Sequence, residues 1–487
     1  MNDAGMYLVP FARGNRKVTW DIRIFDDRPF FLDLLSFPYM QLVVRSECCL
    51  IGAPPQVVKR LQSELSMNNP RYEDAKRYGR WIGKKLQPRL YFYRRKGERL
   101  YFPRGFGNEA VRLCRQLTGE APALVDQRRL LPPIELHFAG KLRAYQQQAV
   151  EDAAAGSFGV LEAGTGSGKT VMALALMARR AQPTLVLVHT KELLNQWLER
   201  IEQFLGIEAG QAGDGRLDIR PLTVAIVNTA RKHLDDLVPC FGHLVVDECH
   251  RVPASLFTES VAAFDSHYML GLSATAFRRD DGTTRLIYMY MGELVHQVDS
   301  NMLAASGAVL QPELIQKPTS FRYGFQGDYA KLLKALTEDP GRNGLILEDA
   351  LRLARQPDRS TVLLVSDRRA HCEFFAEGLA AQGVAVALLT GQTAKEEREQ
   401  IVADVQAGKL EVLVATVQLI GEGFDCPGLS TLVLSTPIKF EGRLLQVAGR
   451  IVRPAAGKTA VIVDYVDSAV PLLRRSAVAR RAVLAGW

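Results

Sequence analysis

The residues with the clearest capacity for chemistry form the segment 163–170, which reads Ala-Gly-Thr-Gly-Ser-Gly-Lys-Thr. An apolar strand is expected before it at 158–161, and a helix rich in alanine, leucine and methionine after it at 171–180. Glycines let successive backbone N–H groups surround an anion, and a helix N-terminus adds partial positive charge. We therefore predict a phosphate-binding loop, in which Lys169 reaches the β- and γ-phosphates and the Thr170 hydroxyl holds Mg²⁺. The loop residues expected around the phosphates are Gly164, Thr165, Gly166, Ser167 and Gly168.

Two adjacent carboxylates, Asp247 and Glu248, follow an expected buried strand at 243–246. Asp247 is of the type that holds Mg²⁺, directly or through water, and Glu248 is placed to orient and deprotonate an attacking water. Two acids can also simply cap a helix N-terminus, and a Gly/Ser loop can simply be flexible. The two motifs together favour ATP hydrolysis, so ATP and Mg²⁺ are the expected ligands.

Further candidates for the nucleotide site lie on either side of these motifs. The amide of Gln146, about 20 residues before the loop, matches the donor and acceptor edges of adenine. Arg450 and Arg453 lie three residues apart at the end of a helix expected at 441–450. A guanidinium suits phosphate oxygens, so these arginines can act as arginine fingers when two domains close. A basic helix end on the surface is the alternative.

The elements around these residues alternate between buried apolar strands and helices. Such alternation predicts parallel sheets covered on both faces, with ligands at the carboxyl ends of the strands. The expected fold class is α/β, with two tandem parallel-sheet domains preceded by a small α+β accessory domain. The expected boundaries are 1–135 for the accessory domain, 136–278 for the first sheet domain, 279–340 for a less regular connection, and 341–487 for the second sheet domain with a C-terminal basic helix.

The net charge of +8 is concentrated in one stretch. Between Arg71 and Arg104, twelve Lys/Arg oppose three acids, and aromatic residues lie among them. A concentrated basic face is the electrostatic footprint of a polyanion-binding surface. We therefore predict a nucleic-acid face in the accessory domain, with Arg94, Arg95 and Lys96 among its contacts. The alternative is a solvated basic surface with aromatics in the core.

The remaining composition is that of an ordinary globular protein. The chain has seven cysteines without CxxC spacing, which indicates reduced thiols and no zinc site. No apolar run approaches the roughly 20 residues that span a bilayer, and no secretory signal is visible. A cytosolic protein is expected.

Taken in order over about residues 140–465, the motifs resemble those of superfamily 2 helicases. The resemblance is carried by Leu-Arg-Ala-Tyr-Gln, the phosphate loop, Asp-Glu-Cys-His, Ser-Ala-Thr, Gly-Glu-Gly-Phe-Asp and Gln-Val-Ala-Gly-Arg-Ile-Val-Arg. The first of these and the Phe-Arg-Arg-Asp-Asp-Gly turn are similar to the XPB/UvsW-like branch, which is related to the DEAD/DEAH-box proteins. The resemblance implies two RecA-like domains with ATP in the cleft between them, nucleic acid across both, and movement in the 3′→5′ direction.

The resemblance also implies a role for each motif residue. Nucleotide contacts are expected from Arg143, Gln146, Lys169, Thr170 and Asp425, with Mg²⁺ held by Thr170 and Asp247. Hydrolysis is expected to involve Lys169, Asp247, Glu248, Gln446, Arg450 and Arg453. Coupling of hydrolysis to motion is expected from His250, Ser273 and Thr275, and contacts to the nucleic-acid backbone from Thr190, Lys191, Thr229, Gly391 and Thr416.

Together these features predict an ATP-driven DNA helicase or double-strand translocase. It is expected to unwind or branch-migrate forked or branched DNA, with residues 1–135 gripping the duplex. An RNA helicase is an alternative, because Asp-Glu-Cys-His and Ser-Ala-Thr also occur there. A second alternative is a nucleic-acid sensor or clamp that uses ATP as a conformational timer without unwinding.

Overall fold

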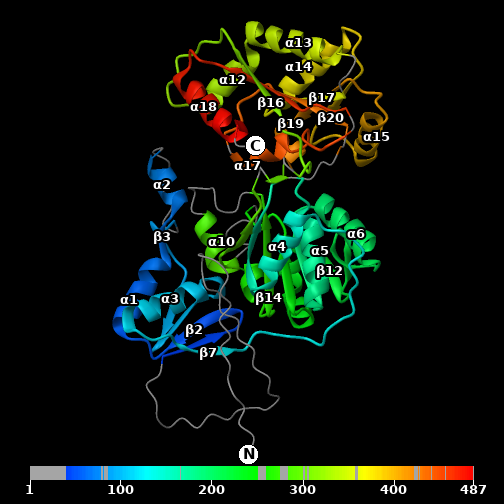
Figure 1. Cartoon of the computed structure of the whole chain (residues 1–487). Coiled ribbons are helices and arrows are strands. Elements are labelled where there is room, and N and C mark those ends of the chain that lie inside the picture. Colours follow the sequence, from blue (N-terminus) through cyan, green and yellow to red (C-terminus); the bar gives the residue numbers. More distant parts are fainter. Residues whose placement is uncertain are drawn as a thin grey trace, which may run out of the picture. The chain divides into compact units, whose positions relative to one another are not determined.

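The computed structural model describes residues 40–77, 81, 86–164, 166–250, 259–274, 283–299, 302–303, 306–356, 360–421, 426, 428–439, 441–455 and 457–485. The chain forms two compact units, the first made of residues up to 163 and 169–297, and the second of residues 164–168 and 298 onward. The first unit contains the accessory domain and a large sheet, and the second contains another sheet (Figure 1). The expected α/β class, with an α+β domain in front of two parallel-sheet domains, is confirmed.

The large sheet of the first unit has the strand order β11-β10-β12-β9-β13-β14-β8-β15. All neighbours pair in parallel except the β10–β11 hairpin. The central strands consist almost entirely of buried apolar residues, as expected where helices cover both faces. The strands are β8 (Phe158–Glu162), β9 (Thr184–Val188), β10 (Gly210–Gly213), β11 (Arg216–Asp218), β12 (Leu222–Ile226), β13 (His243–Val246), β14 (Tyr268–Ser273) and β15 (Leu294–Gln297). The main helices are α4 (Ala144–Ala154), α5 (Lys169–Arg180), α6 (Lys191–Leu205), α7 (Val227–Ala230) and α10 (Thr283–Met291).

The sheet of the second unit is wholly parallel, in the order β16-β21-β20-β17-β19-β18. Its strands are β16 (Glu313–Pro318), β17 (Thr361–Ser366), β18 (Val386–Leu389), β19 (Val412–Thr416), β20 (Leu429–Leu434) and β21 (Val461–Val466). Its helices are α12 (Tyr329–Glu338), α13 (Pro340–Ala354), α14 (Arg369–Ala380), α15 (Lys395–Gln406), α16 (Val417–Gly421), α17 (Glu441–Ala448) and α18 (Pro471–Ala485). The basic helix α18 is only partly a solvated face, because Arg480 is buried and its Nε donates to Asp464 over 2.9 Å.

The segment expected as a less regular connection, 279–340, instead contains regular elements of both sheets. Helix α10 and strand β15 belong to the first sheet domain, whereas β16 and α12 belong to the second. Both strands lie at the outer edge of their sheets and are only partly buried. Edge strands carry polar residues, so β15 and β16 lack the continuous apolar run that marks a central strand.

The accessory domain is a five-stranded sheet in the order β5-β6-β2-β1-β7, with helices α1 and α3. Strands β5 and β6 form a hairpin, in which Lys96 pairs with Arg99. A smaller two-stranded sheet, β3–β4, and helix α2 extend from it. The strands are β1 (Gln41–Val44), β2 (Glu47–Ile51), β3 (Ser66–Asn68), β4 (Arg89–Tyr91), β5 (Arg94–Lys96), β6 (Arg99–Pro103) and β7 (Ala123–Asp126), and the helices are α1 (Pro55–Glu64), α2 (Pro70–Arg77) and α3 (Gly107–Thr118).

Helix α10 joins the accessory domain to the first large sheet. Met289 is fully buried in the accessory core, while Ile287 and Met291 of the same helix pack into the core of the large sheet. Arg104, counted above in the basic stretch, lies inside this junction, where it donates to the Ser266 carbonyl over 2.6 Å. Burial, reinforced by nearby Arg128, lowers the pKa of Arg104 to about 9. Arg104 therefore adds no charge to an exposed basic face, because this buried cation holds the accessory domain against the first large sheet.

At Gly105 the accessory domain lies close to the backbone of α10, and Gly105→Ala is expected to loosen the junction. An added Cβ would lie 2.5 Å from the Gly292 nitrogen and 2.7 Å from the Met289 carbonyl oxygen, and backbone cannot swing aside. Overpacking of this kind costs about 1–3 kcal/mol. Thermal unfolding and proteolysis of the accessory domain should both report the loss. The control is Gly344→Ala in α13, where a Cβ meets nothing within 4 Å; equal destabilisation by both variants would contradict the prediction.

Candidate nucleotide and nucleic-acid site

The predicted phosphate loop lies between the carboxyl end of β8 and the first turn of α5. Gly166 and Gly168 have φ angles of +85° and +82°, a region that favours glycine, so the loop needs these residues for its backbone path. Helix α5 begins at Lys169, which places Lys169 and Thr170 in its first turn. A helix N-terminus preceded by a glycine-rich loop is a favourable environment for phosphate. Thr165 lies outside the described residues.

Lys169 lies between the loop and the carboxylate motif. Its Nζ donates to the Ala163 carbonyl over 3.0 Å and lies 3.8 Å from Glu248 Oε1. Glu248 follows Asp247 at the end of β13 and adopts a left-handed backbone with φ of +46°. This uncommon conformation for a residue with a side chain is often found where function requires a particular orientation. The structure thus brings Lys169 and Glu248 together, as expected for residues that share a phosphate substrate.

Asp247 is almost fully buried and is held in place by two donors. Trp197 Nε1 donates to its Oδ2 over 2.8 Å, and the Glu248 N–H donates to its Oδ1 over 2.9 Å. Burial, followed by the neighbouring charge of Glu248, raises the pKa of Asp247 to about 6. Two carboxylates near a single lysine form a site that a divalent cation would stabilise. Carboxylate and hydroxyl oxygens are the ligands that Mg²⁺ prefers, so Asp247 and Thr170 fit the predicted metal.

The predicted coupling residues His250 and Ser273 are also brought together. His250 Nδ1 lies 2.7 Å from the Ser273 Oγ at the end of β14, and 3.3 Å from Glu248 Oε2. The Ser273 carbonyl in turn accepts the N–H of Ala163 over 2.9 Å. Contacts therefore run in a closed ring through Lys169, Glu248, His250, Ser273 and Ala163. Thr275, the third predicted coupling residue, lies outside the described residues.

Gln146 has a structural partner that the sequence did not reveal. Its side chain is buried, and its Oε1 accepts the backbone N–H of Arg143 over 2.9 Å, which caps the start of α4. Arg143 itself has an exposed side chain. An N-cap interaction of this kind holds the helix entry in a fixed conformation. The predicted adenine contact of these two residues remains a prediction.

The predicted arginine fingers follow α17 in the second unit. Arg450 is largely buried, and its Nε donates to the Ile420 carbonyl over 3.2 Å. Arg453 is half-buried, and its own carbonyl accepts Lys458 Nζ over 2.8 Å. Burial, followed by the charge of Arg453, lowers the pKa of Lys458 to about 8. Gln446 is buried on α17, and Asp425 lies outside the described residues. The roles of these residues at the nucleotide stay predictions.

The predicted nucleic-acid contacts lie at strand ends within each sheet. Thr190 and Lys191 follow β9, and Thr229 lies in the short helix after β12. Because β9 and β12 are parallel neighbours, their carboxyl ends meet at the same sheet edge. Thr190 caps α6 by accepting the Leu193 N–H over 3.2 Å, and Lys191 pairs with Asp214 over 2.6 Å. In the second sheet, Thr416 ends β19 and Gly391 follows its neighbour β18.

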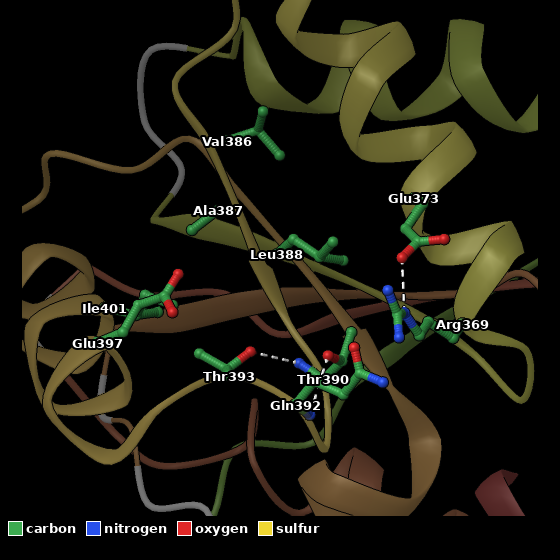
Figure 2. A pocket seen from close by; sticks show the side chains of 10 residues that line it. All are labelled: Arg369, Glu373, Val386, Ala387, Leu388, Thr390, Gln392, Thr393, Glu397 and Ile401. Carbon is green, nitrogen blue, oxygen red and sulfur yellow. Dashed lines mark hydrogen bonds and ion pairs between the residues drawn. The ribbon is translucent and has the colours of Figure 1, made fainter.

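Gly391 adjoins a hollow of about 470 Å³ along the open edge of β18. Figure 2 shows Glu373 of α14 on one side of the strand and Glu397 of α15 on the other. Arg369 is the one basic residue in the lining, and its Nε donates to Glu373 over 2.6 Å. Two acids against one engaged cation disfavour phosphate inside the hollow. Gly391 and Gln392 are exposed, whereas Thr390 is buried, and the nucleic-acid contact of Gly391 stays a prediction.

Arg94, Arg95 and Lys96 lie on β5, the exposed outer strand of the accessory sheet. Arg94 is partly engaged, because it pairs with Glu47 and its guanidinium lies 4.0 Å from the centre of the Tyr101 ring. Arg95 contacts the nearby Gly97 carbonyl over 2.9 Å. Basic side chains along an exposed edge discourage pairing with another strand and present charge to solvent. Arg95 and Lys96 are thus the more available cations of the three.

Comparison with known proteins bears on the whole arrangement. A model of the type III restriction enzyme res subunit matches residues 139–278, and one of the helicase conserved C-terminal domain matches 345–455. A probable helicase, D10, of Escherichia phage T5 is 28% identical over 351 residues, which cover 70% of this chain and 75% of the relative. A DNA 3′-5′ translocase, XPB2, of Sulfurisphaera tokodaii is 26% identical over 364 residues, which cover 67% of this chain and 81% of the relative.

Two further similarities extend this result. A putative ATP-dependent RNA helicase, QP509L, of African swine fever virus is 25% identical over 412 residues, covering 77% of this chain and 78% of the relative. A fragment of a putative HsdR subunit of a type I restriction enzyme from Vibrio vulnificus has the same fold, with a TM-score of 0.54 and 20% identity over 69% of this chain and 66% of that one. The chain belongs to the superfamily 2 helicases of the XPB/UvsW-like type, and its two parallel sheets are RecA-like domains. It is therefore an ATP-dependent helicase of nucleic acid.

One residue of the site, Trp197, was not predicted from the sequence. It positions Asp247, but a tryptophan on the apolar face of α6 cannot be distinguished by sequence from an ordinary core residue.

Among the residues that the structure describes, no helix is both long enough and apolar enough to cross a membrane.

Proposed function

We propose that this protein is an ATP-dependent DNA helicase or translocase that moves 3′→5′ and acts on forked or branched DNA. The observation that carries the ATP-driven part of the proposal is the closed ring of contacts through Lys169, Glu248, His250, Ser273 and Ala163. It joins the phosphate loop, the hydrolytic carboxylate and the end of β14, so a change at the nucleotide can be transmitted to Ser273. The DNA translocase name of a relative supports DNA as the substrate.

Different residues of the chain have different roles in the proposed ATP hydrolysis. Lys169 and the N-terminus of α5 hold the phosphates, and Glu248 accepts a proton from the attacking water. Mg²⁺, held by Asp247 and Thr170, would neutralise charge that develops on the phosphates. Trp197 prevents Asp247 from rotating away, and His250 holds Glu248 against Ser273. Arg450 and Arg453 would supply positive charge from the second domain.

A panel of nucleic acids tests the proposal. ATP hydrolysis and strand displacement are measured with single-stranded, duplex, forked and four-way DNA of matched sequence, and with RNA of the same designs. Forked or four-way DNA should give the greatest stimulation, with displacement starting from a 3′ overhang. Greater stimulation by RNA would replace DNA with RNA as the substrate. Stimulation by DNA without any displacement or branch migration would instead support the sensor or clamp.

An RNA substrate is the second candidate, favoured by the RNA helicase name of the viral relative. The same nucleotide site serves either polymer, since the ring of contacts involves no nucleic acid. Residues that touch the sugar distinguish RNA from DNA, because only RNA carries a 2′-hydroxyl there. The panel therefore decides between the two without any change to the assignment of the nucleotide site.

Replacing Arg95 and Lys96 by alanine is expected to weaken DNA binding and to reduce its salt dependence. Each lost phosphate contact lowers the slope of log affinity against log salt by about 0.7 to 0.9. Fluorescence anisotropy between about 50 and 200 mM salt measures both effects. The control removes two lysines from α12, Lys331 and Lys334, which are 77% and 72% exposed. A slope that changes equally in both double variants would exclude the β5 edge as a specific contact.

A further inference from the structure

Among the described aromatic residues of the basic stretch, two differ from the others in their exposure. Phe102 and Phe106 are buried in the accessory core, where aromatics are expected. Trp81, in contrast, is 89% exposed and Tyr91 is 61% exposed. Large aromatic side chains gain free energy by burial. Trp81 and Tyr91 instead present flat apolar faces to solvent within the basic stretch, although the Tyr91 ring also meets the Tyr93 ring edge-on, with the two ring centres 6.0 Å apart.

Trp81 belongs to an excursion of the chain whose base is closed. The Asn69 N–H donates to the Pro88 carbonyl over 2.9 Å, and Asn69 Nδ2 donates to the Gln87 carbonyl over 2.8 Å. Asn69 is buried, and the pairing of Asn68 with Arg89 continues the closure into β3 and β4. Figure 1 shows α2 and β3 leading away from α1 and β2. We call the described residues of this part of the chain, 69–77, 81 and 86–91, the finger.

Tyr91 lies at the base of the finger next to a cation. Arg89 and Tyr91 are two residues apart on β4, so they project from the same face of the strand, and both are exposed. Lys76 on α2 and the β5 residues Arg95 and Lys96 add exposed positive charge to the same part of the domain. A ligand that matches this surface has negative charge and flat apolar rings. Single-stranded nucleic acid offers both, since its phosphates are accompanied by base faces that are free to stack.

We propose that Trp81 and Tyr91 stack on unpaired bases at the branch point of the DNA. A continuous duplex hides its base faces in the stack, whereas a fork or junction exposes them, so these residues make the accessory domain a sensor of unpaired DNA rather than of duplex alone. The inference rests on the proposed function, because it names the feature of the DNA substrate that the finger recognises. Arg89 and the β5 cations contribute phosphate contacts, and the two aromatic rings contribute selectivity for unpaired bases.

Intrinsic fluorescence gives a direct test on the full chain. The protein has four tryptophans, and Trp197 is buried. The difference between the wild-type and Trp81→Phe spectra isolates Trp81. Titration with a single-stranded oligodeoxythymidine, and with a fork that carries unpaired arms, should quench this difference signal, because a stacked base quenches tryptophan. A blunt duplex of equal length should leave it nearly unchanged.

Affinity provides the second test. Trp81→Ala and Tyr91→Ala should each weaken binding of the single-stranded and forked probes by about 5- to 150-fold, the range expected for loss of one stacked base. Duplex affinity and duplex-stimulated ATP hydrolysis should stay unchanged. The salt slope should also stay unchanged, which separates stacking from the loss of a phosphate contact. Trp81→Phe and Tyr91→Phe should retain most of the affinity, because a benzene ring still stacks.

Phe374→Ala is the matched control, since this aromatic is 46% exposed on α14 of the second domain. It should leave all three affinities unchanged. An equal loss for duplex and unpaired probes in Trp81→Ala, or an absence of quenching by any nucleic acid, overturns the inference and leaves the finger as a surface for protein. If duplex and forked DNA still stimulate ATP hydrolysis in that case, only the inference fails. If no DNA stimulates hydrolysis in the wild type, the proposed function fails.

Discussion

Lys169→Ala is expected to lower nucleic-acid-stimulated ATP hydrolysis by about 10³-fold, the upper range for loss of one preorganised donor to a developing charge. The structure supplies the reason, because Lys169 is the cation 3.8 Å from Glu248 and stands in the first turn of the helix that follows the phosphate loop. Without it, the carboxylates Asp247 and Glu248 lose their neutralising charge and repel the phosphates of ATP. Nucleotide affinity should fall together with turnover.

Glu248→Gln separates binding from hydrolysis at the same site. The amide keeps the shape of the side chain but accepts no proton, so hydrolysis should fall by about 10²- to 10⁴-fold while ATP still binds. Steady-state hydrolysis and binding of a fluorescent nucleotide measure the two effects. Lys331→Ala serves as the control, because this lysine is 77% exposed on α12. Full hydrolysis in Lys169→Ala would exclude the assigned nucleotide site.

Arg453→Ala is expected to reduce hydrolysis by about 10³- to 10⁵-fold if Arg453 acts as an arginine finger. The effect should fall on turnover, with nucleotide affinity changed far less, because a finger contributes most as charge develops in the transition state. Replacing Arg453 tests the finger role with less effect on stability than replacing Arg450, since Arg453 is only half-buried. Arg450 is largely buried and donates to the Ile420 carbonyl, so its removal also leaves a polar group without a partner.

Arg450→Ala is therefore expected to combine the loss of hydrolysis with a loss of stability of about 1–3 kcal/mol. Thermal unfolding of both variants separates the two contributions. Arg474→Ala, an exposed arginine on α18, is the control for charge alone. Wild-type turnover in Arg453→Ala would remove that residue from the nucleotide site. Wild-type turnover in both variants would leave no support for arginine fingers from the second domain.

The docking of the accessory domain has a consequence for the proposed movement. Helix α10 is shared between the accessory core and the core of the first large sheet, and Arg104 and Gly105 pack into the same junction. The accessory domain and the phosphate-binding sheet therefore form one packed body. Force on DNA held by the accessory domain would be transmitted to the sheet that carries Lys169 and Glu248.

The sequence alone determined the parts of this protein that depend on local order. The phosphate loop, the Asp-Glu-Cys-His motif and the central strands could be predicted, because glycine-rich turns and short apolar runs impose a backbone path on their own neighbours. Strand β13 begins and ends at the residues expected, 243 and 246. The resemblance to the helicase family could also be stated from the sequence, because the motifs and their order along the chain are properties of the sequence.

The tertiary structure decided what depends on partners distant in sequence. Trp197 reaches Asp247 across 50 residues, and Arg104 reaches the Ser266 carbonyl across 162 residues. Edge strands such as β15 and β16 are stabilised by one neighbour strand, so their own residues carry little signal. Phe102 is buried whereas Trp81 is exposed, although both aromatics belong to the same basic stretch. Local sequence specifies a backbone path, but the environment of a side chain is set by segments that only the folded chain brings together.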